Sequence, residues 1–378
     1  MKTYAIPPLS LYIHFPWCVQ KCPYCDFNSH KVVDQFQEQA YLDCLLKELD
    51  NNETLLRERN IDTVFMGGGT PSLFSPSSIA AVLNHLFDIT QHRPREITLE
   101  ANPGTADAGH FSGYLDAGVN RLSLGVQSFA DAQLKKLGRI HDSQQAIQAY
   151  QTARCCGFRN INLDLMHGLS GQTTKGALMD LEQAIELAPD HLSWYQLTLE
   201  PNTYFARFPP SLPDDDAIWE MHLAGTELLA KNGYEQYEVS AFSQHNKTCQ
   251  HNLNYWLFND YLGIGAGAHS KLTHSERIKR HWNEKHPKRY MNSNIATIAG
   301  EATVGDKQVL FEYMMNRLRL ASPINEDELF EATHRRIGDL EPTLSNLVHK
   351  KLIHPNKESI MLTSRGRSLL NDVIMAWL

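Results

Sequence analysis

Residues 9–25 read LSLYIHFPWCVQKCPYC, an apolar stretch that is followed at once by a loop with three cysteines. The apolar and aromatic residues 9–15 predict a buried β-strand. Behind it, Cys18, Cys22 and Cys25 have the spacing C-x3-C-x2-C. Thiolates are the ligands of iron–sulfur clusters, and this short spacing lets one loop present several of them to a single cluster. The segment therefore predicts a cluster-binding loop at the end of a strand.

Zinc is the alternative occupant of such a loop. A structural zinc site takes four ligands, usually as two well-separated pairs. Three cysteines on one loop leave the fourth position open, which in a four-iron cluster leaves one iron free to bind a small molecule. Three incidental buried thiols are the remaining interpretation, because free cysteine is often a packing residue.

The alternation of strand and helix continues outward from this segment to about residue 242. Apolar, β-branched runs are separated by amphipathic stretches, which predicts parallel βα units. Six or seven units fit a closed or partly closed α/β barrel, and a doubly wound open sheet is the alternative. We expect strands at 9–15, 63–66, 96–101, 121–126, 160–165, 191–199 and 234–241, and helices at 34–58, 76–89, 107–117, 130–156 with a break, 174–188 and 215–232.

The residues directly after the predicted strands favour the barrel. Each of the first six strands ends in a polar or glycine-rich motif, and in a parallel barrel all these ends meet on the face that carries the chemistry. The motifs are the cysteine loop, Gly67-Gly68-Gly69-Thr70-Pro71, Glu100 with Asn102-Pro103-Gly104, Gln127, Asp164 with His167, and Thr198-Leu199-Glu200-Pro201.

The pattern changes after residue 242, and we divide the chain into 1–242, 243–305 and 306–378. The barrel occupies the first part, and a connecting region rich in His, Asn, Gly and aromatic residues the second. The third part reads as helices with two short β-like stretches, which resembles a small winged-helix module. Its ten Lys and Arg are balanced by ten Asp and Glu, which argues against DNA binding.

Composition narrows the function further. The chain has 378 residues, 42% of them hydrophobic, and a formal net charge of -8, as expected of a folded globular protein and not of a general nucleic-acid binder. Seven cysteines, an odd number, do not indicate a disulfide framework. The sequence has no apolar run long enough for a membrane span and no evident secretory signal, so we expect a cytoplasmic protein.

The cysteine motif, with an aromatic residue before its last cysteine, and the Gly-Gly-Gly-Thr-Pro segment after the next strand together resemble the radical S-adenosylmethionine (SAM) proteins. Within them the chain is similar, over nearly its whole length, to the oxygen-independent coproporphyrinogen III oxidase family and to its heme-chaperone branch. The resemblance implies an open barrel of six βα units with a small, mainly helical domain behind it.

The resemblance also implies roles for individual residues. Cys18, Cys22 and Cys25 match the ligands of a [4Fe–4S] cluster, whose fourth iron is chelated by the amino and carboxylate groups of SAM. A glycine lets the backbone approach a ligand closely, which fits the matched glycines to that role. The positions that match SAM contacts are Tyr12, Gly68, Gly69, Thr70, Glu100, Gln127, Arg139 and Asp164.

Two departures set this sequence apart from the catalytic oxidases. Those enzymes carry a further cysteine two residues after the third ligand, where this chain has Phe27, and a longer segment before the motif, where this chain has 17 residues before Cys18. Both departures match the heme-chaperone branch and argue against porphyrinogen decarboxylation.

A second motif, His251-Asn252-Leu253-Asn254-Tyr255-Trp256, resembles the heme-associated motif of that branch. Imidazole ligates heme iron and aromatic side chains can cover the macrocycle, so the resemblance implies a heme-related role for His251. A loop whose aromatic residues pack on the barrel is the alternative.

Other histidines and cysteines are weaker candidates. His269 follows a glycine-rich run that allows it to approach the barrel mouth, whereas His14 fits a satisfied buried histidine. Cys249 is either a second heme-reactive group or a small packing residue. Histidines 245, 274, 281 and 286 crowd the same region as His269, and Cys44, Cys155 and Cys156 fall on predicted helices.

Three functions follow from these observations. The first is a chaperone that binds heme and delivers it to acceptor hemoproteins, including respiratory ones, as a monomer or homodimer with transient membrane-protein contacts. The second is a radical SAM enzyme that decarboxylates porphyrinogen propionates. The third is a zinc-bearing scaffold.

Overall fold

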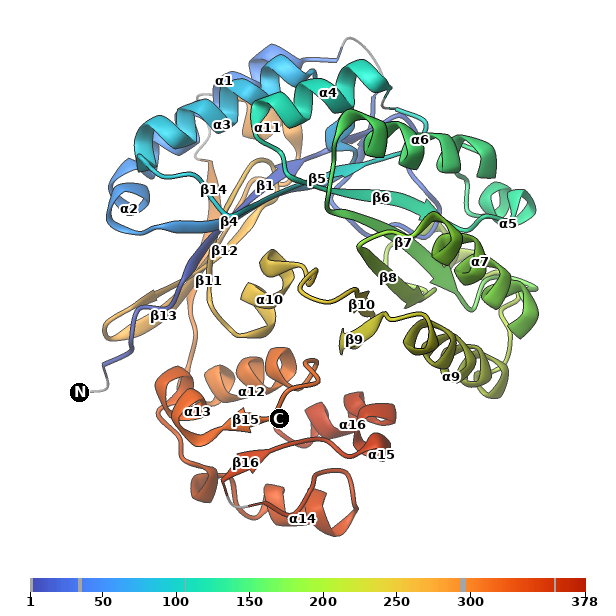
Figure 1. The fold of residues 1–378 in the computed structure, drawn as a ribbon. Coiled ribbons are helices and arrows are strands. Elements are labelled where there is room, and N and C mark those ends of the chain that lie inside the picture. Colours follow the sequence, from blue (N-terminus) through green and yellow to red (C-terminus); the bar gives the residue numbers. More distant parts are fainter. Residues whose placement is uncertain (1–2, 33–35, 106, 293–296, 357) are drawn as a thin grey trace.

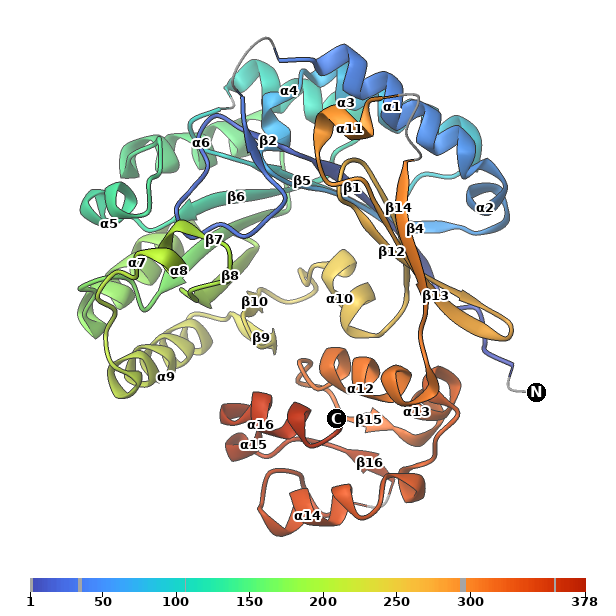
Figure 2. The same cartoon turned by 180° about the vertical axis from the view of Figure 1, so that it is seen from behind.

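The protein was studied as a computed structural model that describes residues 3–32, 36–105, 107–292, 297–356 and 358–378. Its centre is a sheet whose middle strands run parallel, curved into a crescent in Figures 1 and 2. These strands are β11 (Asp260–Ile264), β1 (Leu9–Phe15), β4 (Ile61–Gly68), β5 (Glu96–Ala101), β6 (Arg121–Gln127), β7 (Ile161–His167) and β8 (His191–Gln196).

Antiparallel strands extend the sheet on both sides. Next to β11 lie β12 (His269–His274), β13 (Arg277–Asn283) and β14 (Ile298–Thr303), and next to β8 lie β10 (Ala241–Ser243) and β9 (Glu235–Glu238). In the part of the chain that is described, the sheet starts at β14 and stops at β9, and these two edges do not pair. The barrel is therefore open, which confirms the partial barrel of six βα units.

Helices cover the convex face of the crescent, as Figure 1 shows. Strand periodicity explains the two faces, since successive side chains point to opposite sides. On β1, Leu9, Leu11 and Ile13 pack in the core under the helices, while Tyr12 and His14 face the concave side. The convex helices are α1 (Glu38–Asn51), α2 (Glu53–Glu58), α3 (Pro76–Thr90), α4 (Ala108–Ala117), α5 (Asp131–Lys136), α6 (Ser143–Cys156), α7 (Thr174–Leu187) and α9 (Asp215–Lys231).

Local sequence fixes where these helices begin and end. Helix α6 begins at a capping box of Asp142 and Gln145 and ends at Gly157, whose φ of 109° suits glycine. The predicted helix 34–58 is two helices, α1 and α2, separated at Asn52, and its residues 34 and 35 lie outside the described part.

The predicted strand 234–241 was wrong. It is a hairpin in which β9 and β10 pair antiparallel, because the chain turns back at residues 239 and 240. Glu238 holds the turn by accepting a hydrogen bond from the amide of Ser240 at 3.0 Å. The strand predicted at 191–199 stops at Gln196, where Leu197 leaves the sheet and donates its amide to the carbonyl of His167 at 2.9 Å.

The segment 243–305, expected as a connecting region, supplies β11–β14 and two helices, α10 (Gln250–Trp256) and α11 (Pro287–Tyr290). Helix α10 lies on the concave side of the sheet, inside the crescent in both Figures 1 and 2. Residues 293–296 of this segment lie outside the described part. The boundaries of the three units stay a prediction.

The segment 306–378 forms a second hydrophobic core below the open side of the crescent (Figure 1). Tyr4, Phe258 and Ile278 from the sheet side contribute to this core. Its elements are α12 (Asp306–Arg317), β15 (Ile324–Asn325), α13 (Glu326–Thr333), a 3-10 turn (Ile337–Leu340), α14 (Thr343–His349), β16 (Ser359–Ile360), α15 (Ser364–Ser368) and α16 (Leu370–Met375). Across the described residues, every helix is too short or too polar to span a membrane.

Candidate functional site

The cysteine loop is a compact excursion between β1 and α1. It begins and ends in a two-stranded ladder of β2 (Trp17–Cys18) and β3 (His30–Lys31). Inside it, the amide of Cys25 donates to the carbonyl of Cys22 at 3.2 Å, which closes a turn. The ammonium group of Lys21 donates to the carbonyls of Phe27 and Ser29. All three thiols are half-buried and free of disulfides.

The surroundings of the thiols fit a thiolate-bound cluster. Arg139 donates from Nη1 to the sulfur of Cys22 at 3.5 Å and from Nη2 to the carbonyl of Gly125 at 2.6 Å. Burial raises the pKa of the Cys18 and Cys25 thiols, so a positive partner is needed to hold thiolates there. A bound metal cluster and the guanidinium of Arg139 both supply such charge.

The three sulfurs do not converge on one point. Across the described residues, no group of three Cys, His, Asp or Glu side chains is placed to hold a single metal ion. A mononuclear zinc site needs that convergence, whereas the thiolates of a four-iron cluster bind different irons. Three thiols on one loop provide the kind of donor that a four-iron cluster uses.

Gly68, the last residue of β4, and Gly69 pack against β1 and the start of the cysteine loop, and their approach to a ligand stays a prediction. A Cβ on Gly68, whose φ is 109°, would lie 2.3 Å from the ring of His14, and one on Gly69 would lie 2.5 Å from the carbonyl of Trp17. The amide of Thr70 also donates to the carbonyl of Trp17 at 2.7 Å. Protein packing therefore requires these glycines, whether or not a ligand approaches them.

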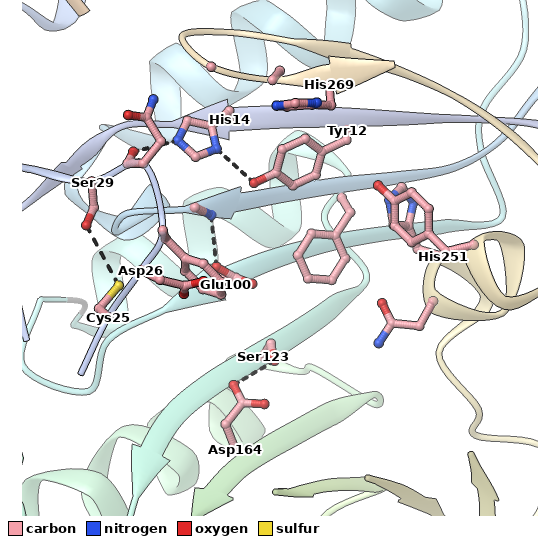
Figure 3. A pocket seen from close by; sticks show the side chains of 18 of the residues that line it. Tyr12, His14, Cys25, Asp26, Ser29, Glu100, Ser123, Asp164, His251 and His269 are labelled. Atoms are coloured by element: carbon pink, nitrogen blue, oxygen red, sulfur yellow. Dashed lines mark hydrogen bonds between the residues drawn. The ribbon is translucent and has the colours of Figure 1, made fainter. Parts of the chain in front are cut away.

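A cavity of about 900 Å³ occupies the concave side of the sheet, and Figure 3 shows its lining. It brings together residues that are far apart in the sequence. Cys22, Thr70 and Arg139 line a small recess next to the loop, whereas Cys18, Gly69 and Gln127 line neither space. The predicted site residues that line the large cavity are Tyr12, Cys25, Gly68, Glu100, Asp164 and His251.

Burial raises the pKa of two carboxyl groups in the cavity, and Glu100 favours its neutral form at neutral pH. Burial, with the Asp164 charge as a second cause, raises the pKa of Glu100 to about 8, although its Oε2 accepts a hydrogen bond from the amide of Gly68. Burial also raises the pKa of Asp164, which accepts hydrogen bonds from Ser123 and Asn162. A protonated carboxyl both donates and accepts, which suits a ligand with amino and hydroxyl groups.

Tyr12 reaches the cysteine loop through a histidine. Its hydroxyl lies 2.9 Å from Nδ1 of His14, and Nε2 of His14 lies 2.8 Å from the carbonyl of Asn28. A carbonyl only accepts, so Nε2 carries the proton and Nδ1 accepts from Tyr12. Burial lowers the pKa of His14 to about 4, which confirms the expected satisfied, buried histidine.

Gln127 and Arg139 act beside the cavity. Gln127 has a φ of 74° at the end of β6, and its side chain accepts a hydrogen bond from the hydroxyl of Tyr195 at 2.7 Å. The left-handed backbone at Gln127 interrupts the regular alternation of side chains along the strand, so this side chain does not follow it. Both side chains therefore contact protein groups around the cavity.

His251 lies on a helix and not in a loop. Its side chain is 1% exposed, and both ring nitrogens have partners: Nδ1 lies 2.8 Å from the hydroxyl of Thr63, and Nε2 lies 3.1 Å from that of Tyr255. Glu96 accepts hydrogen bonds from the amides of Gln250 and His251, which fixes the first turn of α10. Burial lowers the pKa of His251 to about 3.

Cys249, one residue before α10, is a packing residue. It is 0% exposed, and its thiol lies 3.7 Å from Glu96. Burial raises the pKa of this thiol to about 12, which disfavours the thiolate that would bind iron. Glu96 thus gathers three donors at the start of α10.

Arg121, the first residue of β6, was missed by the sequence analysis. It is 2% exposed, lines the cavity, and makes no ion pair within the described part of the chain. Thr98, its register partner on β5, also has a buried hydroxyl without a hydrogen-bond partner there. A charged residue at the start of a predicted buried strand is the signal that could have identified it.

His269, the first residue of β12, lies where the cavity opens to solvent. Its side chain is exposed, and within the described residues neither ring nitrogen has a hydrogen-bond partner. Figure 3 shows its ring above those of Tyr12 and His14. The exposed residues that line this opening are Lys21, Asp26, Phe27, Pro201, Asn202, His269 and Lys285, and we call them the mouth.

Known proteins share this architecture and sequence. Residues 12–184 match the model of the radical SAM superfamily. The heme chaperone HemW of Haemophilus influenzae is 46% identical over 99% of this chain and 98% of its own, and that of Escherichia coli is 46% identical over 99% of both. Coproporphyrinogen III oxidase (HemN) from Escherichia coli superposes over 99% of this chain and 91% of its own, with a TM-score of 0.84 and 23% identity, and it shares the fold. The chain belongs to the radical SAM superfamily and, within it, to the family of the heme chaperone HemW.

Proposed function

We propose that this protein is a heme chaperone that binds heme and transfers it to acceptor hemoproteins. The observation that carries the proposal is the 46% identity, over 99% of the chain, to proteins named heme chaperones. A cavity of about 900 Å³ with an open mouth supports it, because a bulky planar ligand needs such an entrance.

The same protein is proposed to carry a [4Fe–4S] cluster and SAM. Cys18, Cys22 and Cys25 would hold the cluster, with Arg139 against the sulfur of Cys22. Tyr12, Glu100 and Asp164 would contact SAM in the cavity beside them. When bound, the cluster would supply the electron that reductive cleavage of SAM needs. The protein residues bind and orient these groups and exclude water from them.

Phe27 supports the chaperone over the oxidase. It takes the place of a further cysteine of the oxidases, and its side chain is 57% exposed at the mouth. An exposed aromatic ring at a ligand entrance suits contact with an apolar macrocycle.

A radical SAM enzyme that decarboxylates porphyrinogen propionates is the second candidate. It is favoured by the neutral carboxyl of Glu100 and the position of Asp164, which leave the proposed SAM contacts intact. Anaerobic incubation of the reconstituted protein with SAM and coproporphyrinogen III separates the two candidates. We expect no vinyl product, and robust turnover would overturn the chaperone proposal.

The direct test of the chaperone is heme binding followed by transfer. Full-length protein is titrated with hemin and followed by visible absorption, and the complex is then mixed with an apo-hemoprotein such as apomyoglobin. We expect saturable binding and movement of the absorption band to that of the acceptor. A protein that binds no heme, or never releases it, contradicts the proposal.

The partners and location follow as parts of the same proposal. Respiratory hemoproteins are the proposed acceptors, reached by transient contact with membrane proteins from the cytoplasm. We propose a monomer or a homodimer, which sedimentation of the heme-free and heme-bound protein distinguishes.

A further inference from the structure

Two histidines in the cavity differ in what they offer to a metal. An imidazole ligates iron through a ring nitrogen with a free lone pair. His251 has Nδ1 against Thr63 and Nε2 against Tyr255, so ligation would break a buried hydrogen bond. Its side chain lines the cavity but is only 1% exposed, and Glu96 holds the first turn of α10 in place.

His269 has neither obstacle. It is exposed at the mouth, and no hydrogen bond occupies its ring nitrogens in the part of the chain that is described. Partial burial and the charges of Lys285 and Arg280 lower its pKa, which favours the neutral ring. A neutral imidazole is the form that binds iron.

The backbone around His269 is held against the cysteine loop. The side-chain amide of Asn28 donates to the carbonyls of Ala266 and Lys285, both at 2.8 Å. Gly267 makes this approach possible, since a Cβ there would lie 2.4 Å from the Asn28 side chain. The segment before β12 therefore presents His269 at a fixed place beside the loop.

The remaining residues of the mouth suit heme in other ways. Phe27 offers an exposed aromatic ring, and Lys285 offers a positive charge to a carboxylate. Lys21 already donates hydrogen bonds to two carbonyls of the loop, and Asp26 adds one negative charge. Heme is a macrocycle with an iron at its centre and carboxylates at one edge, so it matches an imidazole, an aromatic ring and an ammonium group together.

We propose that His269 is the imidazole that ligates heme iron, with the macrocycle docked at the mouth between the cysteine loop and β12. This inference rests on the proposed heme-chaperone function and adds the site and its iron ligand. His251 then has a positioning role, because it holds α10 against β4 through Thr63.

The test is a hemin titration of full-length protein and three variants, His269→Ala, His251→Gln and His274→Ala. His274 is the matched control, since it is an exposed histidine on the same strand but outside the cavity. We expect only His269→Ala to lose the absorption spectrum of histidine-ligated heme. Added imidazole should restore that spectrum, because it supplies the missing ligand.

Each outcome has one meaning. A wild-type protein that binds no heme overturns the proposed function and this inference with it. A wild-type protein that binds heme, with His269→Ala retaining the histidine-ligated spectrum, overturns this inference alone. Loss of that spectrum in a folded His251→Gln protein, as judged by circular dichroism, would assign the ligand to α10.

Discussion

One histidine, His269, lies at the mouth of the cavity and another, His251, lies at its floor, which α10 forms. The two regions differ in how far their side chains are buried. On the floor, which we define as His251 with Cys249 and Glu96 behind it, all three side chains are buried, and each polar group contacts a neighbour. At the mouth, Phe27 and His269 are exposed. The ring of His269 stacks on Trp282, but its nitrogens have no hydrogen-bond partner in the described structure. Buried polar groups that are satisfied hold a fold together, whereas free groups at an opening are available to a ligand. We therefore expect the floor to contribute to the stability of the fold, and we propose that the mouth binds the ligand.

The largest expected effect is on the iron–sulfur cluster, and it should distinguish Cys22 in the cysteine loop from Cys249 on the floor. Cys22→Ser should abolish the iron–sulfur cluster, because it removes one of three thiolate ligands and the partner of Arg139. Cys249→Ser on the floor should leave it unchanged. Iron and acid-labile sulfide per chain, after anaerobic reconstitution, give the measurement. Equal iron in both variants would show that the loop does not hold the cluster.

The next effect concerns the floor. Glu96→Ala leaves the amides of Gln250 and His251 without their acceptor in a buried place. We expect a loss of about 3 kcal/mol in the free energy of unfolding, since hydrogen bonds to a charged group are worth roughly 1.5–3 kcal/mol each. Urea denaturation followed by circular dichroism measures it. Heme affinity of the folded fraction should stay unchanged, and a selective loss of that affinity would place binding on the floor.

The two histidines, His251 and His269, should differ in how they affect the stability of the fold at acid pH. The folded pKa of His251 is about 3, below the ordinary 6.5, so the unfolded chain takes up a proton in this interval that the folded chain does not. The stability from neutral His251 is present above pH 6.5 and is lost as the pH falls towards 3. Glu100 has the opposite effect on the pH dependence of stability. Its folded pKa is raised from the ordinary 4.5 to about 8, so the stability from its neutral form is lost as the pH rises through this interval.

His251→Gln should therefore flatten the acid side of the stability curve relative to the wild type, by at most about 1.4 kcal/mol per pH unit. The difference between variants isolates His251 from Glu100. Denaturant midpoints from about pH 4 to about pH 7 provide the measurement. His269→Gln is the control and should follow the wild-type curve far more closely. Identical slopes for His251→Gln and the wild type would mean that His251 is not held neutral by burial.

The smallest expected effect is at the rim of the mouth. Phe27→Ala should leave the free energy of unfolding within about 0.5 kcal/mol, because the ring is 57% exposed. Heme affinity should fall roughly fivefold, or about 1 kcal/mol, as apolar contact with the macrocycle is lost. Phe208→Ala is the control, an equally exposed phenylalanine away from the cavity. Equal affinities for the two variants would remove Phe27 from the docking surface.

Local signals in the sequence were sufficient for the barrel and the cysteine loop. The strand period, the ends of the strands and the spacing of Cys18, Cys22 and Cys25 are all short-range patterns. They favoured a closed or partly closed barrel, and the family resemblance added that the barrel is open. The structure shows the open sheet and places Tyr12, Glu100 and Asp164 in the cavity on its concave side.

The mouth and the floor depend on contacts between distant parts of the chain. Strand β11 pairs with β1, with Asp260 opposite Leu9, and this pairing brings His251 and His269 into the same cavity. No local pattern specifies that one of them becomes buried by α10 and the other exposed. Arg121, which makes no ion pair among the described residues, likewise became evident only when the cavity around it was known.

Hydrogen–deuterium exchange with and without hemin tests the central claim most directly, because it locates the bound ligand along the chain. We expect slower exchange in peptides that cover 26–31 and 266–274, at the mouth, with 250–256 on the floor unchanged. Slower exchange confined to 250–256, with the mouth unchanged, would contradict it.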